Sequence, residues 1–175
     1  MAYISNLVYH YANDLQFKDD LPIEEVEKLI KAKGMTIPLT KLKISWECEG
    51  VTIRMDMLNP TVGKYPLYIT PLSDLSGFIC FEESWKANNN CLLLNAFGLE
   101  RMRLTVPVEL TKRDIPKTNQ MCFLGITSPW TEFGGKFGVH AWIEGSGSGG
   151  YLEGDWYFEL DYHTGQFLWG REMRN

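Results

Sequence analysis

Apolar and polar residues alternate along much of this chain, which is the pattern of strands with one buried face. The alternation is strictest at 151–163. One face of that segment is apolar and carries Leu152, Trp156, Phe158, Leu160 and Tyr162. The other face is mostly acidic and carries Glu153, Asp155, Tyr157, Glu159, Asp161 and His163. We expect a strand that packs its apolar face in a core and presents the acidic face as a candidate functional surface.

A hairpin is predicted residue by residue at 41–58, because a two-residue Glu49-Gly50 turn separates two runs that alternate with period two. The apolar pairs across the hairpin are Cys48 with Val51, Trp46 with Ile53, Ile44 with Met55, and Leu42 with Met57. On the other face, the same register pairs Lys43 with Asp56 and Glu47 with Thr52. The turn chemistry and the hydrophobic pattern therefore indicate one register.

Short strand-like runs continue along the chain, separated by turns that contain Asn, Gly or Pro. They lie at 3–11, 65–70, 77–82, 91–96, 99–110, 120–127 and 136–144. Pro107 falls inside one of them and indicates an edge, a bulge or a break into two strands. The chain is therefore expected to be mainly β, an antiparallel barrel or sandwich built from sequential hairpins across 40–171.

One N-terminal amphipathic helix is predicted at about 22–33. Acidic residues lie in its first turn and Gly34 follows its end. Val26, Leu29 and Ile30 form its apolar stripe. This stripe should lie against a sheet or close one end of a barrel.

Length and composition favour one globular domain over 1–175. Apolar residues make up 45% and charged residues 22% of the chain, which is ordinary for a folded protein. The pI is near 5.2 and there is no basic cluster, so we expect no nucleic-acid partner. No segment has the length and apolar character of a membrane span, and the N-terminus lacks a basic start. We expect a soluble, cytoplasmic protein without a membrane partner, although a mature secreted form stays open.

The cysteines are scattered without close pairs, at Cys48, Cys80, Cys91 and Cys122. Three of them lie in strand-like runs, where a free cysteine acts as a small hydrophobe. We expect free thiols in a reducing compartment. The chain has no nucleophile elbow, phosphate-binding glycine loop, Cys-x-x-Cys pair or His-Glu-x-x-His helix, so neither a cofactor nor a metal is expected.

Charge is segregated towards the C-terminus. The stretch between Lys136 and Arg171 contains no Lys or Arg, whereas it contains five acidic residues. The whole chain has 17 basic and 22 acidic residues, so the remainder balances, 17 against 17 (22 minus 5), and this stretch holds the entire net charge of -5. The carboxylates are therefore a local feature.

Two further hairpins extend the acidic face to neighbouring strands. A turn at Thr164-Gly165 pairs His163 with Gln166, Tyr162 with Phe167 and Leu160 with Trp169. A hairpin across the Gly/Ser segment 145–150 pairs Val139 with Trp156, Phe137 with Phe158, Ile143 with Leu152, Trp142 with Glu153 and His140 with Asp155. That loop, which also resembles an engineered linker, leaves the register loose. Because only even shifts keep the core apolar, His140 and Trp142 stay on the acidic face. The predicted patch is His140, Trp142, Glu144, Tyr151, Glu153, Asp155, Tyr157, Glu159, Asp161 and His163, backed by a core of Val139, Trp156, Phe158 and Trp169.

Four interpretations of this patch stay open. A solvated outer sheet face also alternates charges. Carboxylates beside aromatic rings are typical of sites for cations or basic protein surfaces. On the wall of a cavity, Asp155 would orient His140 while Tyr157 donates a proton. The same His and carboxylates are also metal-ligand types.

We favour a non-enzymatic binding protein that recognises a small cationic ligand or a protein partner through Trp142, Glu144, Tyr151 and the acidic row. The alternative is a small barrel enzyme of the isomerase, cyclase or lyase type, in which His140 and Asp155 perform acid/base chemistry. A third alternative is a protein that forms homo-oligomers through exposed strand edges.

Overall fold

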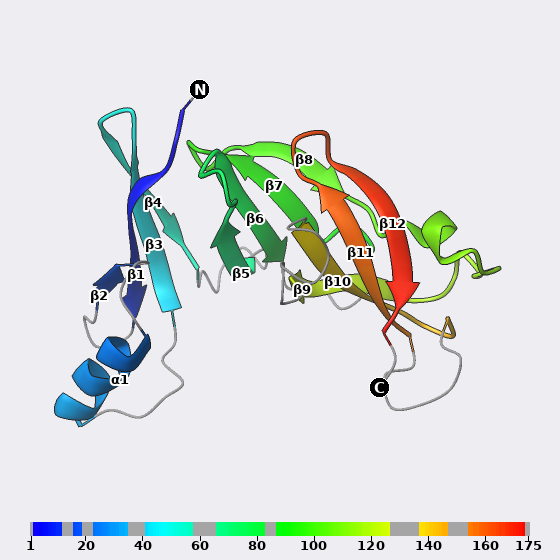
Figure 1. Cartoon of the computed structure of the whole chain (residues 1–175), viewed down its shortest axis with the longest axis horizontal. Helices are drawn as coiled ribbons and strands as arrows, with labels where there is room; N and C mark the ends of the chain where they lie inside the picture. Colours follow the sequence, from blue (N-terminus) through cyan, green and yellow to red (C-terminus); the bar gives the residue numbers. More distant parts are fainter. Residues whose placement is uncertain are drawn as a thin grey trace.

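The computed structural model describes residues 2–11, 16–18, 23–34, 41–57, 66–82, 87–126, 137–146 and 154–173. In these ranges the strands form three antiparallel sheets of four strands each. Figure 1 shows the three sheets along the long axis of the molecule, with one sheet between the other two. We call them the N-terminal, middle and C-terminal sheets.

Each sheet is built from strands close together in the sequence. The N-terminal sheet has the order β2-β1-β3-β4, with β1 at Ser5–Tyr11, β2 at Gln16–Lys18, β3 at Lys41–Cys48 and β4 at Val51–Asp56. The middle sheet has the order β5-β6-β7-β8, with β5 at Pro66–Pro71, β6 at Gly77–Glu82, β7 at Cys91–Asn95 and β8 at Glu100–Leu104. The C-terminal sheet has the order β12-β11-β10-β9, with β9 at Met121–Ile126, β10 at Phe137–Ile143, β11 at Asp155–Asp161 and β12 at Gln166–Glu172.

The two central strands of the middle sheet, β6 and β7, are buried on both faces. Successive side chains of a strand point to opposite faces, so Phe78 and Cys80 of β6 lie in a core shared with the N-terminal sheet. Ile79 and Phe81 lie in a second core shared with the C-terminal sheet. The continuous apolar run of β6 is the sequence signature of a strand covered on both sides.

The expectation of a mainly antiparallel β protein is confirmed, and the barrel alternative is wrong for the described strands, which form open sheets. The physical reason lies in the middle sheet. A closed barrel of this size buries one face of its sheet inside, whereas β6 and β7 carry apolar side chains on both faces. In this fold a further sheet covers each of these two faces.

The hairpin of β3 and β4 confirms the predicted register. Cys48 pairs with Val51, and the register continues through Trp46 with Ile53, Ile44 with Met55, Glu47 with Thr52, and Lys43 with Asp56. Both turn residues have positive φ, 49° at Glu49 and 78° at Gly50, as a two-residue hairpin turn with matching twist requires. Lys43 and Asp56 form an exposed ion pair at 3.5 Å.

The strand predicted at 99–110 is wrong in its second half. β8 ends at Leu104, and a short 3-10 helix occupies Val108–Thr111 directly after Pro107. None of the three outcomes predicted for this proline, an edge, a bulge or a break into two strands, is observed, because the strand ends before Pro107 and a helix follows it. Proline has no N–H to donate to a ladder. The pattern did not predict the helix, whose Val108 and Leu110 pack against the core beneath the C-terminal sheet.

The helix α1 spans Ile23–Ala32, but the amphipathic stripe predicted for it is not supported. Side chains are described without a gap only at 28–32, where Leu29 is 46% exposed and Ile30 is buried. Val26 lies at a position whose side chain is not described. Residues three or four positions apart lie on the same face of a helix, so an apolar stripe needs several such residues in succession. The part of α1 whose side chains are described is too short to show a stripe.

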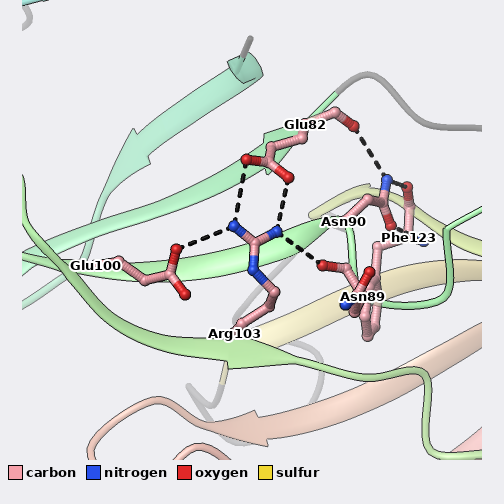
Figure 2. Close-up of polar contacts among 6 residues, drawn as sticks. All are labelled: Glu82, Asn89, Asn90, Glu100, Arg103 and Phe123. Atoms are coloured by element: carbon pink, nitrogen blue, oxygen red, sulfur yellow. Dashed lines mark hydrogen bonds and ion pairs between the residues drawn. The ribbon is translucent and has the colours of Figure 1, made fainter. Parts of the chain in front are cut away.

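Asn90 joins the middle and C-terminal sheets (Figure 2). It is buried, and its amide group donates to the carbonyl oxygens of Phe123 at 2.9 Å and Glu82 at 3.2 Å. Its carbonyl oxygen accepts from the Phe123 amide at 2.8 Å. The side chain therefore satisfies the edge of β9 as a paired strand would.

Arg103 holds the neighbouring end of β6 (Figure 2). Its guanidinium donates to Glu82 at 2.6 Å and to Glu100 at 3.0 Å, and also reaches the carbonyl oxygen of Asn89 at 3.2 Å. Hydrogen bonding to Glu82, supported by Glu100, raises the pKa of Arg103 above its usual range. The network fixes the strand ends on which Asn90 depends.

All four cysteines are free and buried, which confirms the expectation of unpaired thiols. Burial, together with the Glu82 carboxylate and against the opposing effect of Arg103, raises the pKa of Cys80 to about 12. A thiol that is buried and protonated behaves as a small hydrophobe. These cysteines are therefore core residues.

Candidate functional site: an acidic and aromatic face of the C-terminal sheet

The candidate site is the face of the C-terminal sheet that points away from the core. Val139, Trp156 and Phe158 are buried on the core face, as predicted. The alternating positions of the same strands therefore lie together on the opposite face. On β11 these positions are Asp155, Tyr157, Glu159 and Asp161, and on β10 they include His140 and Trp142.

The register between β10 and β11 differs from the predicted one by two residues. Val139 pairs with Phe158 and Phe137 with Leu160, so the partner of His140 is Tyr157 and that of Trp142 is Asp155. The loop between the strands did not constrain the register, and the apolar pattern excluded only odd shifts. Because the shift is even, His140 and Trp142 share a face with the acidic row.

His140 and Asp155 form the pair that the sequence suggested. The His140 Nε2 atom lies 2.8 Å from Asp155 Oδ1, with side chains 26% and 15% exposed. The two residues are diagonal neighbours, not direct partners, and diagonal positions on adjacent strands are within reach of an imidazole. The pair fixes the orientation of the ring.

The centre of the acidic row is not wetted, since Tyr157 is 3% and Glu159 is 5% exposed. A fully solvated sheet face would leave both side chains open to water. Burial raises the pKa of the Tyr157 hydroxyl; the Glu159 carboxylate raises it further, and Arg171 opposes both effects. The middle of the face is therefore a packed polar region.

Trp169 and Arg171 belong to this face, which sequence reasoning missed. A bulge between Glu159 and Leu160 places Trp169 opposite Glu159, although its predicted partner was Leu160 in the core. Its ring lies 5.2 Å from that of Tyr157, and the Arg171 guanidinium lies 5.8 Å from the Tyr157 ring centroid. The predicted core position of Trp169 is wrong, and Phe167 packs there instead.

The β11–β12 turn also differs from the predicted one. The sequence predicted a two-residue Thr164-Gly165 turn, whereas the register begins with Asp161 opposite Gln166 and leaves four residues in the turn. The Asp161 carboxylate accepts from the backbone amide of His163 at 2.9 Å and stabilises the wider turn. A side-chain hydrogen bond from Thr164, followed by that amide, lowers the pKa of Asp161.

The accessible part of the face lies at its two ends. Trp142 and Asp155 are half-buried and Glu144 is exposed at one end, while Asp161 is half-buried and His163 exposed at the other. Tyr151 and Glu153, also predicted for the site, lie outside the described residues. Within the described ranges, no three His, Cys, Asp or Glu residues are grouped so as to hold a metal ion. No described helix is long and apolar enough to cross a bilayer.

Ser146 shows that the start of the Gly/Ser segment is integrated into the fold. Its hydroxyl oxygen accepts from the Trp156 indole N–H at 2.7 Å, and the hydroxyl donates to the Ile143 carbonyl at 2.8 Å. The residue is 1% exposed. A buried indole N–H requires an acceptor, so this serine fixes the tryptophan that backs the site.

The fold is thus a layered antiparallel β protein with an acidic face on an outer sheet. No protein-family model matches the chain, and no curated protein does. Among solved structures, it is similar to a chain from the structure of Tne2 in complex with Tni2. The similarity covers 98% of this chain and 99% of that chain at 9% identity, with a TM-score of 0.61. At this identity the likeness concerns the fold alone.

Proposed function

We propose that this is a non-enzymatic binding protein that recognises a protein partner with a basic surface through the acidic, aromatic face of the C-terminal sheet. The observation that carries the proposal is the concentration of the net charge of -5 in one stretch, whose accessible carboxylates lie on the same outer sheet face as Trp142 and His140. Carboxylates beside aromatic rings attract cations both by charge and by the ring face.

A protein partner fits the dimensions of the face better than a small ligand. Asp155 and Asp161 are at opposite ends of β11, six residues apart, which corresponds to about 20 Å along a strand. The side chains between them are buried, so the accessible carboxylates are separate. A single small molecule does not span that distance, whereas a protein surface does. The similar solved structure is itself a complex of two proteins, which agrees with this proposal.

A defined cationic probe tests the proposal. Titrating the isotope-labelled protein with decalysine should give saturable NMR shifts at Trp142, His140 and the ends of β11, and the affinity should fall as salt is raised. The double variant Asp155→Asn/Asp161→Asn should bind several-fold more weakly. The matched control is Glu109→Gln/Asp114→Asn, which removes the same charge from exposed positions near the 3-10 helix. Equal weakening in both variants, or shifts spread over the whole surface, would refute the face as the site.

The catalytic alternative placed His140 and Asp155 on the wall of a barrel cavity, whereas the described strands form open sheets. The observed pair is a geometry that acid/base catalysis shares with ordinary polar packing. We therefore propose binding, with the His140–Asp155 pair orienting groups of the face.

A further inference from the structure

Exposed apolar side chains gather at one end of the molecule. Figure 1 shows the turns of the β3–β4, β5–β6 and β7–β8 hairpins at the end where the N-terminus lies, opposite α1. Of the eight large hydrophobic residues exposed in the described ranges, five belong to this end. They are Tyr3, Val51, Leu75, Phe97 and Leu99, with exposed fractions of 53%, 57%, 45%, 39% and 64%. We call these residues the hairpin-end surface.

The segments that carry these side chains are in direct contact. The amide of Ile4, next to Tyr3, donates to the Leu75 carbonyl at 2.8 Å. The β5–β6 turn leads into Gly77, which pairs with Asn95 at the start of the β7–β8 turn. Gly98, between Phe97 and Leu99, lies against the indole of Trp46 and the end of Met55 in the β3–β4 hairpin. The segments that carry these side chains are therefore joined to one another across the middle and N-terminal sheets.

Leu75 is at a position that the fold does not require to be leucine. Its φ is 58°, in the left-handed region that bulky residues rarely adopt and that Gly or Asn occupies at low cost. Its side chain is nearly half exposed, so core packing does not explain the choice. A strained backbone that presents an apolar side chain to solvent is an indication of function independent of the exposure of its neighbours.

The charged residues around this surface indicate which charge a partner would carry. Glu47, Glu49 and Glu100 are exposed at the same turns, and Asp74 lies beside Leu75. Of the nearby cations, Arg103 is paired with Glu82 and Glu100, whereas Arg101 donates to the neutral Tyr162 carbonyl and keeps its charge. The carboxylates of Glu47, Glu49 and Asp74 still leave the border with an acidic excess. A second copy would place acidic rims against each other. A partner with an apolar patch bordered by Lys or Arg would be complementary.

We propose that the hairpin-end surface is a docking site for a protein partner that offers aliphatic or aromatic side chains with a basic border. Leu75, Phe97 and Leu99 supply the apolar contact, and the glutamates supply orientation and partner choice. This surface adjoins one end of the face of the C-terminal sheet, where His163 lies 3.8 Å from Asp74, but its apolar side chains belong to segments of the middle and N-terminal sheets.

The probe for this proposal is an 18-residue peptide of Leu and Lys with an amphipathic helical pattern. It should bind saturably, with NMR shifts confined to the turns at 49–51, 74–76 and 96–100. A peptide with Glu in place of Lys should bind at least tenfold more weakly. Leu99→Ser should also weaken binding at least tenfold, while Leu29→Ser, the same change at an exposed leucine of α1 at the opposite end, should leave it within twofold.

Leu75→Asn separates a docking role from a structural one. It should weaken the Leu/Lys peptide at least threefold while the melting temperature is retained or raised, because Asn adopts the left-handed conformation more readily. Equal weakening by Leu99→Ser and Leu29→Ser, or equal binding of the two peptides, would overturn the inference. So would a dimer in sedimentation equilibrium that Leu99→Ser abolishes, since the occupant would then be a second copy. Weakening by Asp155→Asn/Asp161→Asn but not by Leu99→Ser would assign the peptide to the sheet face and overturn this inference alone.

Discussion

Replacing Asn90 with alanine removes the side chain that ties β9 to the middle sheet. The substitution deletes the acceptor of the Phe123 amide and the donor to the Phe123 carbonyl, at 2.8 and 2.9 Å. Because Asn90 is 4% exposed and Phe123 is 2% exposed, water does not readily replace either partner. A buried backbone group left without a partner costs about 1–3 kcal/mol, so two such groups cost about 2–6 kcal/mol. We expect the free energy of unfolding to fall by about 4 kcal/mol.

Urea unfolding followed by tryptophan fluorescence measures this loss, and hydrogen exchange at the Phe123 amide locates it. The matched control is Asn89→Ala, because Asn89 is exposed and contacts Arg103 through its backbone carbonyl, which alanine keeps. The control should lose less than about 0.5 kcal/mol. A loss below about 1 kcal/mol for Asn90→Ala, or unchanged protection of the Phe123 amide, would show that the side chain does not hold the sheets together.

Three further predictions follow from single residues. Gly77→Ala should destabilise the fold by at least about 3 kcal/mol in urea unfolding, because its Cβ would lie 1.9 Å from the Leu94 carbonyl oxygen; a loss below 1 kcal/mol would contradict the packing of β6 on β7. The pKa of Asp161 is lower in the fold than in the unfolded chain, so its stabilisation is present above about pH 4 and lost as pH falls through the folded pKa. Melting temperatures between pH 6 and pH 3 should fall less steeply for Asp161→Asn than for the parent. Arg171→Gln should raise the pKa of Tyr157 further in an ultraviolet titration, and an unchanged pKa would exclude the cation above the ring.

The sequence predicted the β3–β4 hairpin pair by pair because one short turn determines its register. With Glu49 and Gly50 in the turn, the pairing of Cys48 with Val51 determines the pairs that follow. The longer connection before β11 has no such effect, so the predicted register was two residues away from the observed one. Period two still placed His140, Trp142 and Asp155 on the same face of β10 and β11, which is why His140 and Asp155 were placed together.

The composition of the site was harder to predict than its location. A bulge changes which side chains share a face, and no pattern in β12 indicates the one between Glu159 and Leu160. Trp169 and Arg171 therefore entered the acidic face unpredicted. The burial of Glu159 could not be predicted either, because an alternating pattern with an acidic residue at this position is typical of a solvent-exposed sheet face.

The sequence of β6 indicates that the fold has a third layer, and this indication was not used when the fold was predicted from the number of strand-like runs. Gly77–Phe81 contains no polar side chain, whereas β4 alternates. An unbroken apolar strand in an antiparallel sheet requires cover on both sides, which excludes a two-layer sandwich around that strand.

Two cores with one shared sheet also limit how the chain can be divided. Removing the N-terminal sheet would expose Phe78, Cys80, Leu92 and Leu94, and removing the C-terminal sheet would expose Ile79, Phe81, Cys91 and Leu93 on the same two strands. Either fragment would present an apolar sheet face to water and aggregate. Expression of this protein in parts is therefore expected to fail at either boundary, even though each sheet is formed from a contiguous piece of the sequence.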